Sequence, residues 1–133
     1  IYRDKPVDVT VDCPEDLRFA GEQQDLEEML GNLLDNAAKW CGRRVRLAVS
    51  KAPDPKRPQI IRLRIVVDDD GPGLSEEKRK LIWQRGVRLD ESKPGSGLGL
   101  SIVGDIVRTY RGGWQLGVAK LGGLSVTLYL PIA

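Results

Sequence analysis

Short segments in which apolar and polar residues alternate constrain the fold of this 133-residue chain more than any other feature. Alternation with a period of two places the apolar residues of a strand on one face of a sheet. Each such face must then be buried against a second layer. The alternation is clearest in residues 7–11, 45–49 and 63–67, and two further strands are expected at 114–118 and 124–130. We expect the first strand to form an edge hairpin with the short run 17–20.

Two longer segments have the period of an amphipathic helix. Apolar residues recur at i, i+3, i+4 and i+7 from Glu22 to Trp40, and the pattern stops at Gly42. A second helix is expected from about Ile102 to Tyr110, and a short helical stretch at 75–83. Strands that arrive in pairs with helices between them predict an α/β (α+β) two-layer sandwich. Its sheet is mixed and largely antiparallel, with about five strands, and about three helices cover one face.

Composition limits the class of protein. Apolar residues make up 41% and charged residues 30%, which is typical of a folded globular chain, and the length suits one domain over residues 1–133. Two cysteines without a C-x-x-C pair do not form a disulfide framework, which favours a reducing compartment. The net charge of +2 gives no argument for a nucleic-acid partner. The chain has neither an apolar run of bilayer length nor an initiator Met, so we expect a piece of a longer protein.

The chain contains no histidine. This excludes nucleophile systems built on histidine, histidine metal sites and a phosphoaccepting histidine within the chain. Any chemistry must therefore use groups other than histidine.

The first predicted helix carries a polar row beside its apolar stripe. Glu28, Asn32, Asn36 and Lys39 are spaced by four, four and three residues, so they project from one side of the helix. Two amide oxygens one turn apart suit Mg²⁺, and a lysine one turn further on suits phosphate. A solvated helix face is the alternative interpretation.

Two glycine-rich segments follow at the ends of predicted elements. The segment 69–73 follows a buried strand, and there Asp69 can accept a hydrogen bond from an exocyclic amine, although a plain acidic turn has the same composition. The segment 95–100 opens directly into the second helix, where free backbone N–H groups form an anion site. It matches neither the P-loop nor the dinucleotide fingerprint.

The order of these three segments resembles histidine kinase catalytic domains of the gyrase, Hsp90, histidine kinase and MutL ATPase superfamily, which have the Bergerat ATP-binding fold. Residues 32–39 resemble the N box, and 69–73 and 95–100 resemble the two glycine boxes. The pattern from Ile82 to Asp90 is most similar to the PhoQ-type kinases, with Trp83 where Phe is usual and Trp40 where Tyr or Phe is common.

The resemblance implies that the chain binds ATP with Mg²⁺. Asn32 and Asn36 would hold the metal, Trp40 would stack on adenine, and Asp69 would accept the adenine amino group. Asn36, Lys39 and Lys93 are the implied catalytic residues. The implied nucleotide contacts are Asn32, Asn36, Lys39, Trp40, Asp69, Gly71, Gly73, Arg85, Arg88, Lys93, Gly95, Ser96, Gly97, Leu98, Gly99 and Leu100.

The resemblance also implies a flexible ATP lid over residues 74–94, in which Arg85, Arg88 and Lys93 either neutralise phosphate charge or remain solvated. Related hydrolases carry a Glu at the position of Asn32, where it activates water. An amide cannot act as a general base, so hydrolysis should be slow. For Glu28, one turn earlier, a supporting or solvated role is favoured.

The implied activity is that of the catalytic module of a two-component sensor histidine kinase, which transfers the γ-phosphate to a histidine on a separate dimerisation domain. A response regulator would receive the phosphate, and the full-length protein would be dimeric and anchored in the inner membrane. Alternatives are a regulatory module without transfer activity, a superfamily ATPase and a serine kinase of the anti-sigma type.

Four arginines are expected on the solvent side of the sheet: Arg44, Arg46, Arg62 and Arg64. The default interpretation is a solvated face. Docking of an acidic partner or an anionic lipid is the alternative.

Overall fold

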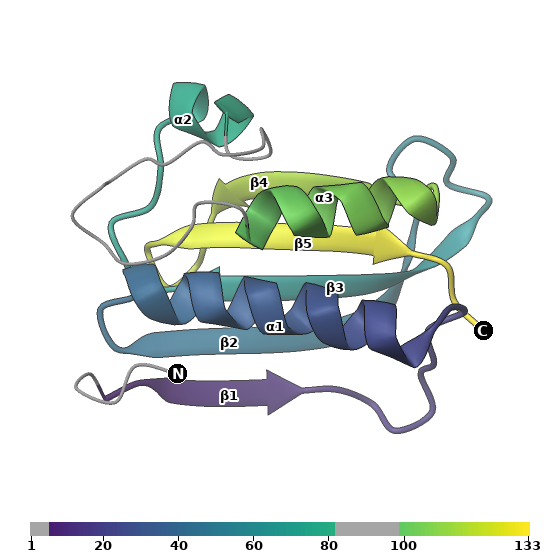
Figure 1. Ribbon diagram of the computed structural model, residues 1–133, viewed down its shortest axis with the longest axis horizontal. Helices are drawn as coiled ribbons and strands as arrows, with labels where there is room; N and C mark the ends of the chain where they lie inside the picture. Colours follow the sequence, from purple (N-terminus) through teal and green to yellow (C-terminus); the bar gives the residue numbers. More distant parts are fainter. Residues whose placement is uncertain (1–5, 82–98) are drawn as a thin grey trace.

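The computed structural model describes residues 6–81 and 99–133 (Figure 1). The strands are β1 (Asp8–Asp12), β2 (Arg44–Pro53), β3 (Ile61–Asp69), β4 (Gly113–Val118) and β5 (Leu124–Leu130). The helices are α1 (Gln23–Trp40), α2 (Glu76–Leu81) and α3 (Gly99–Thr109). The predicted strands and helices are therefore present in the expected order.

The strands form one mixed five-stranded sheet in the order β1-β2-β3-β5-β4. β1 is parallel to β2, and the other neighbouring pairs are antiparallel. α1 connects the two parallel strands, as a parallel pair requires a long crossover. The mixed, largely antiparallel sheet predicted from the sequence is confirmed.

The predicted edge hairpin is wrong. β1 does lie at the edge of the sheet, but it pairs with β2 and not with residues 17–20. Phe19 instead forms an isolated antiparallel bridge with Ile132, at the other end of the chain. The alternation identified the strand correctly, but it carries no information about which neighbour the strand pairs with.

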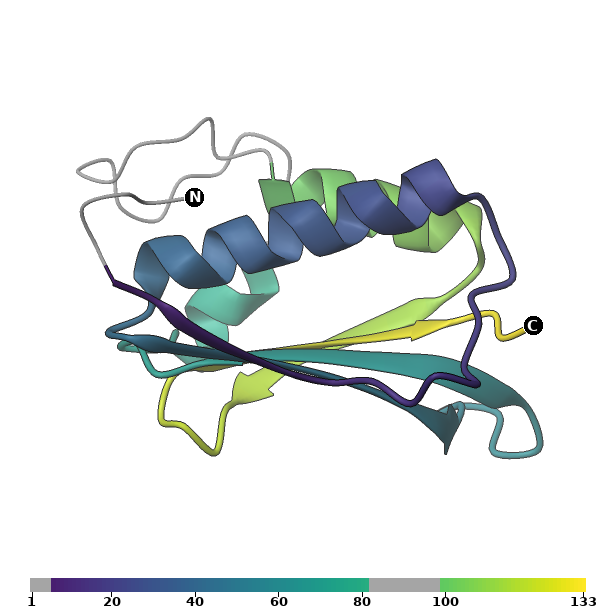
Figure 2. The same cartoon turned by 90° about the horizontal axis from the view of Figure 1, so that it is seen from below.

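The two layers are clearest from the side, where α1 and α3 lie together over one face of the sheet (Figure 2). No described helix covers the opposite face. The apolar stripe of α1 explains this arrangement, because Met29, Leu33 and Ala37 are buried at the spacing of one helix face. They pack against the inward residues of β3, among them Ile65 and Val67. Within the described residues, no helix is long and apolar enough to span a membrane.

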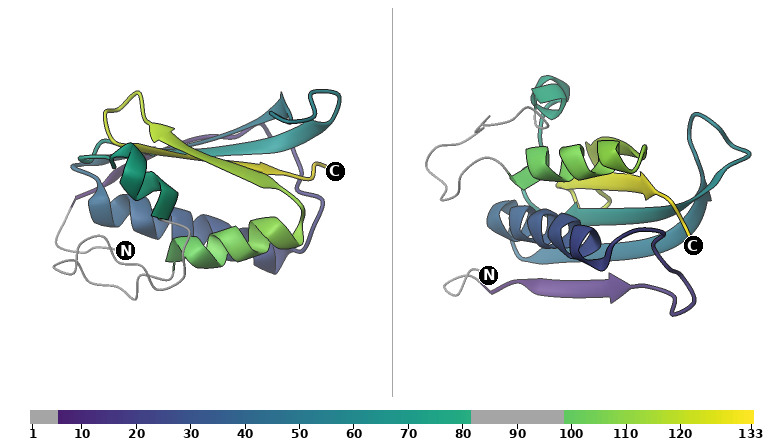
Figure 3. Two further views of the ribbon diagram at one scale, coloured as in Figure 1. Left: turned by 90° about the horizontal axis from the view of Figure 1, so that it is seen from above. Right: turned by 45° about the vertical axis from the view of Figure 1, so that its right-hand side comes forward.

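The two covering helices run antiparallel, so the end of α1 and the start of α3 lie at the same end of the sandwich (Figures 1 and 3). Tyr110, just after α3, contacts the first turn of α1 through Asp25 at the far end.

The bounds of two elements differ slightly from the prediction. β2 extends through Pro53, so the loop to β3 is shorter than the predicted segment 51–59. Residues 76–81 of the predicted stretch 75–83 form α2, which begins with Ser75 Oγ accepting from Lys78 N.

Candidate functional site

Three of the segments singled out in the sequence meet at one end of the sandwich. The end of α1, the loop after β3 and the first turn of α3 all lie there (Figure 1). A side chain built on Gly71 would overlap the carbonyl oxygen of Trp40, and one built on Gly99 would come within 3.3 Å of Asn32 Oδ1. The packing therefore joins α1 to both glycine-rich segments.

Asp69 lies at the base of this end of the molecule and is only 3% exposed. Its Oδ1 accepts hydrogen bonds from the backbone N–H groups of Gly71 at 2.9 Å and Leu124 at 3.2 Å. Burial raises the pKa of the Asp69 carboxyl, and the two backbone donors oppose this shift. The Asp69 carboxylate is therefore shielded from water and held by two backbone N–H groups. In this environment it is suited to accept a hydrogen bond from a polar edge of a bound ligand.

Gly123 makes the position of Asp69 possible. A Cβ at Gly123 would overlap Asp69 Oδ1 and would lie 2.6 Å from both Asp69 O and Gly71 N. Gly123 N also donates to Asp69 O at 3.0 Å. The turn between β4 and β5 thus packs directly on the carboxylate, which is a close approach that only glycine permits.

The polar row on α1 faces the start of α3 at one point. Asn32 Nδ2 donates to the carbonyl oxygen of Glu28 at 2.8 Å, which leaves Oδ1 directed toward Gly99. Asn36 is half-buried one turn further along. Leu100 is 6% exposed and belongs to the core, so it can reach a nucleotide only through its backbone.

Lys39 and Trp40 form the last turn of α1. Both are half-buried, and Lys39 Nζ lies 5.6 Å from the centroid of the Trp40 ring, within cation–π range. Helix C-termini favour positive charge, so the position also suits a lysine. Gly73 has φ +71°, a left-handed conformation that the end of the loop requires.

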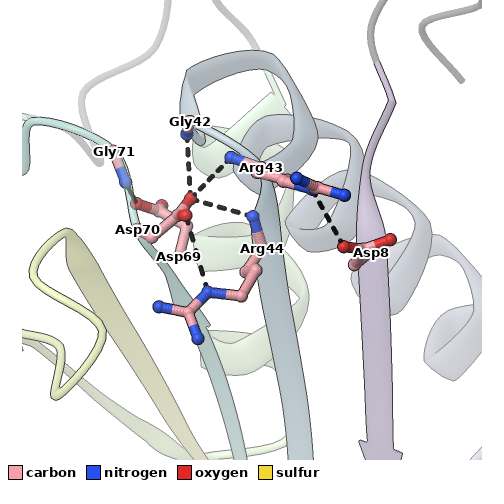
Figure 4. Close-up of polar contacts among 7 residues, drawn as sticks. All are labelled: Asp8, Gly42, Arg43, Arg44, Asp69, Asp70 and Gly71. Carbon is pink, nitrogen blue, oxygen red and sulfur yellow. Dashed lines mark hydrogen bonds and ion pairs between the residues drawn. The ribbon is translucent and has the colours of Figure 1, made fainter.

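Asp70 joins the loop after β3 to the turn after α1. Its Oδ1 accepts from the backbone N–H groups of Gly42, Arg43 and Arg44, each at 2.9 Å (Figure 4). Donation by Arg43 and Arg44 lowers the pKa of the Asp70 carboxyl from its ordinary value. Asp69 and Asp70 are neighbours whose pKa values move in opposite directions, because one is desolvated and the other accepts three N–H bonds.

Seven predicted site residues lie outside the described residues: Arg85, Arg88, Lys93, Gly95, Ser96, Gly97 and Leu98. The proposed lid over 74–94 is described only as far as α2. There, Arg79 donates to the carbonyl oxygen of Leu74 at 2.8 Å, and Leu74 packs against the core.

Three of the four arginines on the outer sheet face have acidic neighbours. Arg62 forms a half-buried ion pair with Asp54 at 2.9 Å, and Arg46 lies 3.8 Å from Asp12. Arg44 lies 3.8 Å from Asp70. These carboxylates offset part of the positive charge on this face, which favours a solvated face over docking of an acidic partner.

Sequence reasoning missed Gly123, Leu124 and Asp70 as parts of this site. Gly122-Gly123 has the composition of an ordinary hairpin turn, and its contact with Asp69 spans more than fifty residues of sequence. Asp70 looked like a mere neighbour of Asp69. Only the pairing of the strands brings these residues together.

A mixed sheet covered on one face, with a buried aspartate between a glycine loop and a helix bearing Asn and Lys, is typical of one class of ATP-binding domain. The chain belongs to that class: residues 21–133 match the family described as histidine kinase-, DNA gyrase B- and HSP90-like ATPase. The resemblance noted from the three motifs is thereby confirmed, as is the two-layer fold.

The relatives are sensor kinases. The chain is 44% identical to the sensor protein kinase CarS of Pseudomonas aeruginosa over 93% of its length, and 38% identical to the sensor protein PhoQ of Escherichia coli O157:H7 over 92%. It spans 26% and 24% of those proteins, about a quarter of their length.

Solved structures give the same result. The mycobacterial sensor histidine kinase MprB superposes with a TM-score of 0.75 at 31% identity, covering 97% of this chain and 83% of that one. Full-length ShkA in complex with AMPPNP superposes with a TM-score of 0.78 at 27% identity, covering 98% of this chain and 26% of that one.

Proposed function

We propose that the chain is the catalytic module of a sensor histidine kinase, which binds Mg²⁺-ATP and transfers the γ-phosphate to a histidine on a separate dimerisation domain. The observation that carries the proposal is Asp69, a buried carboxylate held by backbone donors beside the end of α1. Family membership and the sensor-kinase relatives support it. Because the chain spans only a part of those relatives, the acceptor and the response regulator belong to this proposal.

Asp69 would select adenine, because a carboxylate accepts a hydrogen bond from the exocyclic amino group. Guanine would present a carbonyl oxygen to the same buried carboxylate, which is an unfavourable contact. Trp40 would stack on the base, and Lys39 would contact phosphate. The backbone of residues 95–99 would complete the phosphate contacts, with Arg85, Arg88 and Lys93 contributing charge.

The amide side chains of α1 fit a magnesium ion shared with the nucleotide. Since Asn32 Nδ2 is used by the Glu28 carbonyl, its Oδ1 remains as a hard oxygen ligand, and Asn36 offers a second one turn away. When bound, the ion would neutralise phosphate charge. An amide is not a general base, so these positions favour transfer over water attack.

Transfer then needs only an acceptor. An imidazole nitrogen would form the bond to the γ-phosphorus as the bond to the bridging oxygen breaks and ADP leaves. The chain has no histidine, so the nucleophile must come from another segment. In the full-length protein, we place the module on the cytoplasmic side of the inner membrane, in a dimer.

The test is labelled ATP with a purified histidine-bearing dimerisation domain over a range of concentrations. Labelling should be slow and concentration-dependent, because the tether that sets the effective concentration is missing. Asn36→Ala should abolish transfer, and Lys93→Ala should reduce transfer more than nucleotide binding. Fast release of free phosphate without the acceptor would indicate an ATPase. Nucleotide binding without transfer would indicate a regulatory module.

A further inference from the structure

The side chain of Asp70 connects the loop after β3 to the turn that follows α1. Its Oδ1 accepts from Gly42 N, Arg43 N and Arg44 N at 2.9 Å each, and its own N–H donates to Arg44 O at 3.2 Å. Figure 4 shows the three donors converging on one oxygen. Three successive N–H groups around one oxygen form a concave site, and the acceptor that fills it holds the turn in shape.

The turn held by Asp70 directly follows the residues that would contact the nucleotide. Cys41 caps α1, and the turn begins one residue later, so displacement of the turn displaces Trp40 and Lys39. On the other side, Gly71 packs against the carbonyl oxygen of Trp40 so closely that no Cβ would fit. The end of α1 is therefore fixed to the loop at two adjacent points.

Asp69 is fixed separately, from the β5 side, by Leu124 N and by Gly123. Asp69 and Asp70 thus hold opposite sides of the same loop: Asp69 faces the start of β5 and Asp70 faces the turn after α1. The distance between the Asp69 carboxylate and the Trp40 ring depends on both attachments.

We propose that Asp70 is a positioning residue of the nucleotide site. It holds the end of α1 at a fixed distance from Asp69, so that Trp40 and Asp69 can contact the same base. The inference rests on the proposed ATP-binding function. Asp70 touches no substrate in this proposal, because its Oδ1 is saturated by backbone donors and its side chain is only 16% exposed.

Asp54 provides a matched control. Its Oδ1 accepts from Lys56 N at 2.8 Å and Arg57 N at 3.1 Å, and its Oδ2 accepts from Arg62 Nε at 2.9 Å. It therefore also holds a turn through backbone N–H groups and pairs with an arginine. The Asp54 turn joins β2 to β3 at the far end of the sheet, away from the end of α1 (Figure 1).

The experiment is calorimetric titration of the chain with Mg²⁺-ADP and Mg²⁺-GDP, below the unfolding temperature of every variant. Asp70→Ala should weaken ADP binding by about tenfold to a hundredfold, since losing one hydrogen bond to a charged group, here the one from the base to Asp69, has an effect of this size. The preference for ADP over GDP should fall as well. Asp54→Ala should change ADP affinity by less than about twofold, although its loss of hydrogen bonds lowers the unfolding temperature in the same way.

Two further variants separate geometry from charge and apply even if Asp70→Ala does not fold. Asp70→Asn keeps an oxygen at the same position and should bind ADP within about threefold of the parent chain, because neutral acceptors are roughly half as strong. Asp70→Glu keeps the charge but displaces the turn by a methylene, so it should bind more weakly than Asp70→Asn.

Equal ADP affinities for Asp70→Ala and Asp54→Ala would overturn the positioning role while leaving the proposed function intact. Stronger binding by Asp70→Glu than by Asp70→Asn would also overturn it, since charge and not position would then matter. Failure of the parent chain to bind ADP would instead reject the proposed function, and this inference with it.

Discussion

At the scale of single residues, the buried Asp69 couples ligand recognition to stability. Burial raises its pKa above the ordinary value of 3.8, so the ionised side chain lowers the stability of the folded chain at neutral pH. Asp69→Asn keeps an acceptor for Gly71 N and Leu124 N and removes the buried charge. We expect it to increase the free energy of unfolding at pH 7 by roughly 1 kcal/mol, while adenine selection is lost.

The pH dependence follows from the direction of the shift. Below pH 3.8 the carboxyl is protonated in both states, so the parent chain and Asp69→Asn should have nearly equal stability. As the pH rises through the raised pKa, the parent chain loses stability relative to the variant. Denaturant unfolding of both chains between pH 3 and 8 measures this difference. A difference that is constant with pH, or that favours the parent chain, would contradict the assignment.

At the scale of elements, the first turn of α1 depends on a residue from the far end of α3. Glu22 provides no side-chain cap for α1. Instead, Tyr110 Oη accepts from Glu22 N at 3.0 Å and donates to Asp25, and its ring packs edge-on against Phe19. The hydroxyl therefore replaces part of the missing cap and joins the two helices.

We expect Tyr110→Phe to lower the free energy of unfolding measurably, because it removes two hydrogen bonds, one of them to a carboxylate. ADP affinity should not change, since this contact lies at the opposite end of α1 from Trp40. Tyr129→Phe is the control: its hydroxyl makes one long bond of 3.4 Å to Gln115, so the loss should be smaller. Equal losses in chemical denaturation would show that the connection contributes no special stability.

The elements also show what sequence periodicity can and cannot predict. The stripe of Met29, Leu33 and Ala37 predicted α1 and its buried face, since burial follows directly from the period of the helix. The partners of β1 and Phe19 were not predictable, because pairing depends on contacts between distant segments. The motif residues 32–39 and 69–73 were found from local spacing. The contact of Asp70 with the turn after α1, and that of Gly123 with Asp69, were not found in this way, because they join distant segments.

At the scale of the whole molecule, the site is formed by the ends of helices and strands and by the turns that follow them. α1, the loop after β3 and the turn before β5 each supply one side, and no single element contains the site. Nucleotide that binds all of them should therefore stabilise the complete fold against unfolding, because the separated segments of an unfolded chain have no site.

We expect Mg²⁺-ADP at about 100 times its dissociation constant to add about 2.7 kcal/mol to the free energy of unfolding, as mass action requires for a ligand of the folded state alone. Excess chelator should remove most of this gain, because Asn32 and Asn36 would contact phosphate mainly through the ion. Asn36→Ala should show little gain at the same ADP concentration, whereas Glu27→Ala, exposed on the same helix, should retain it. Denaturant unfolding with and without chelator measures each difference. An ADP-dependent gain that persists in chelator, or that Asn36→Ala retains in full, would show that the amides of α1 do not hold a metal.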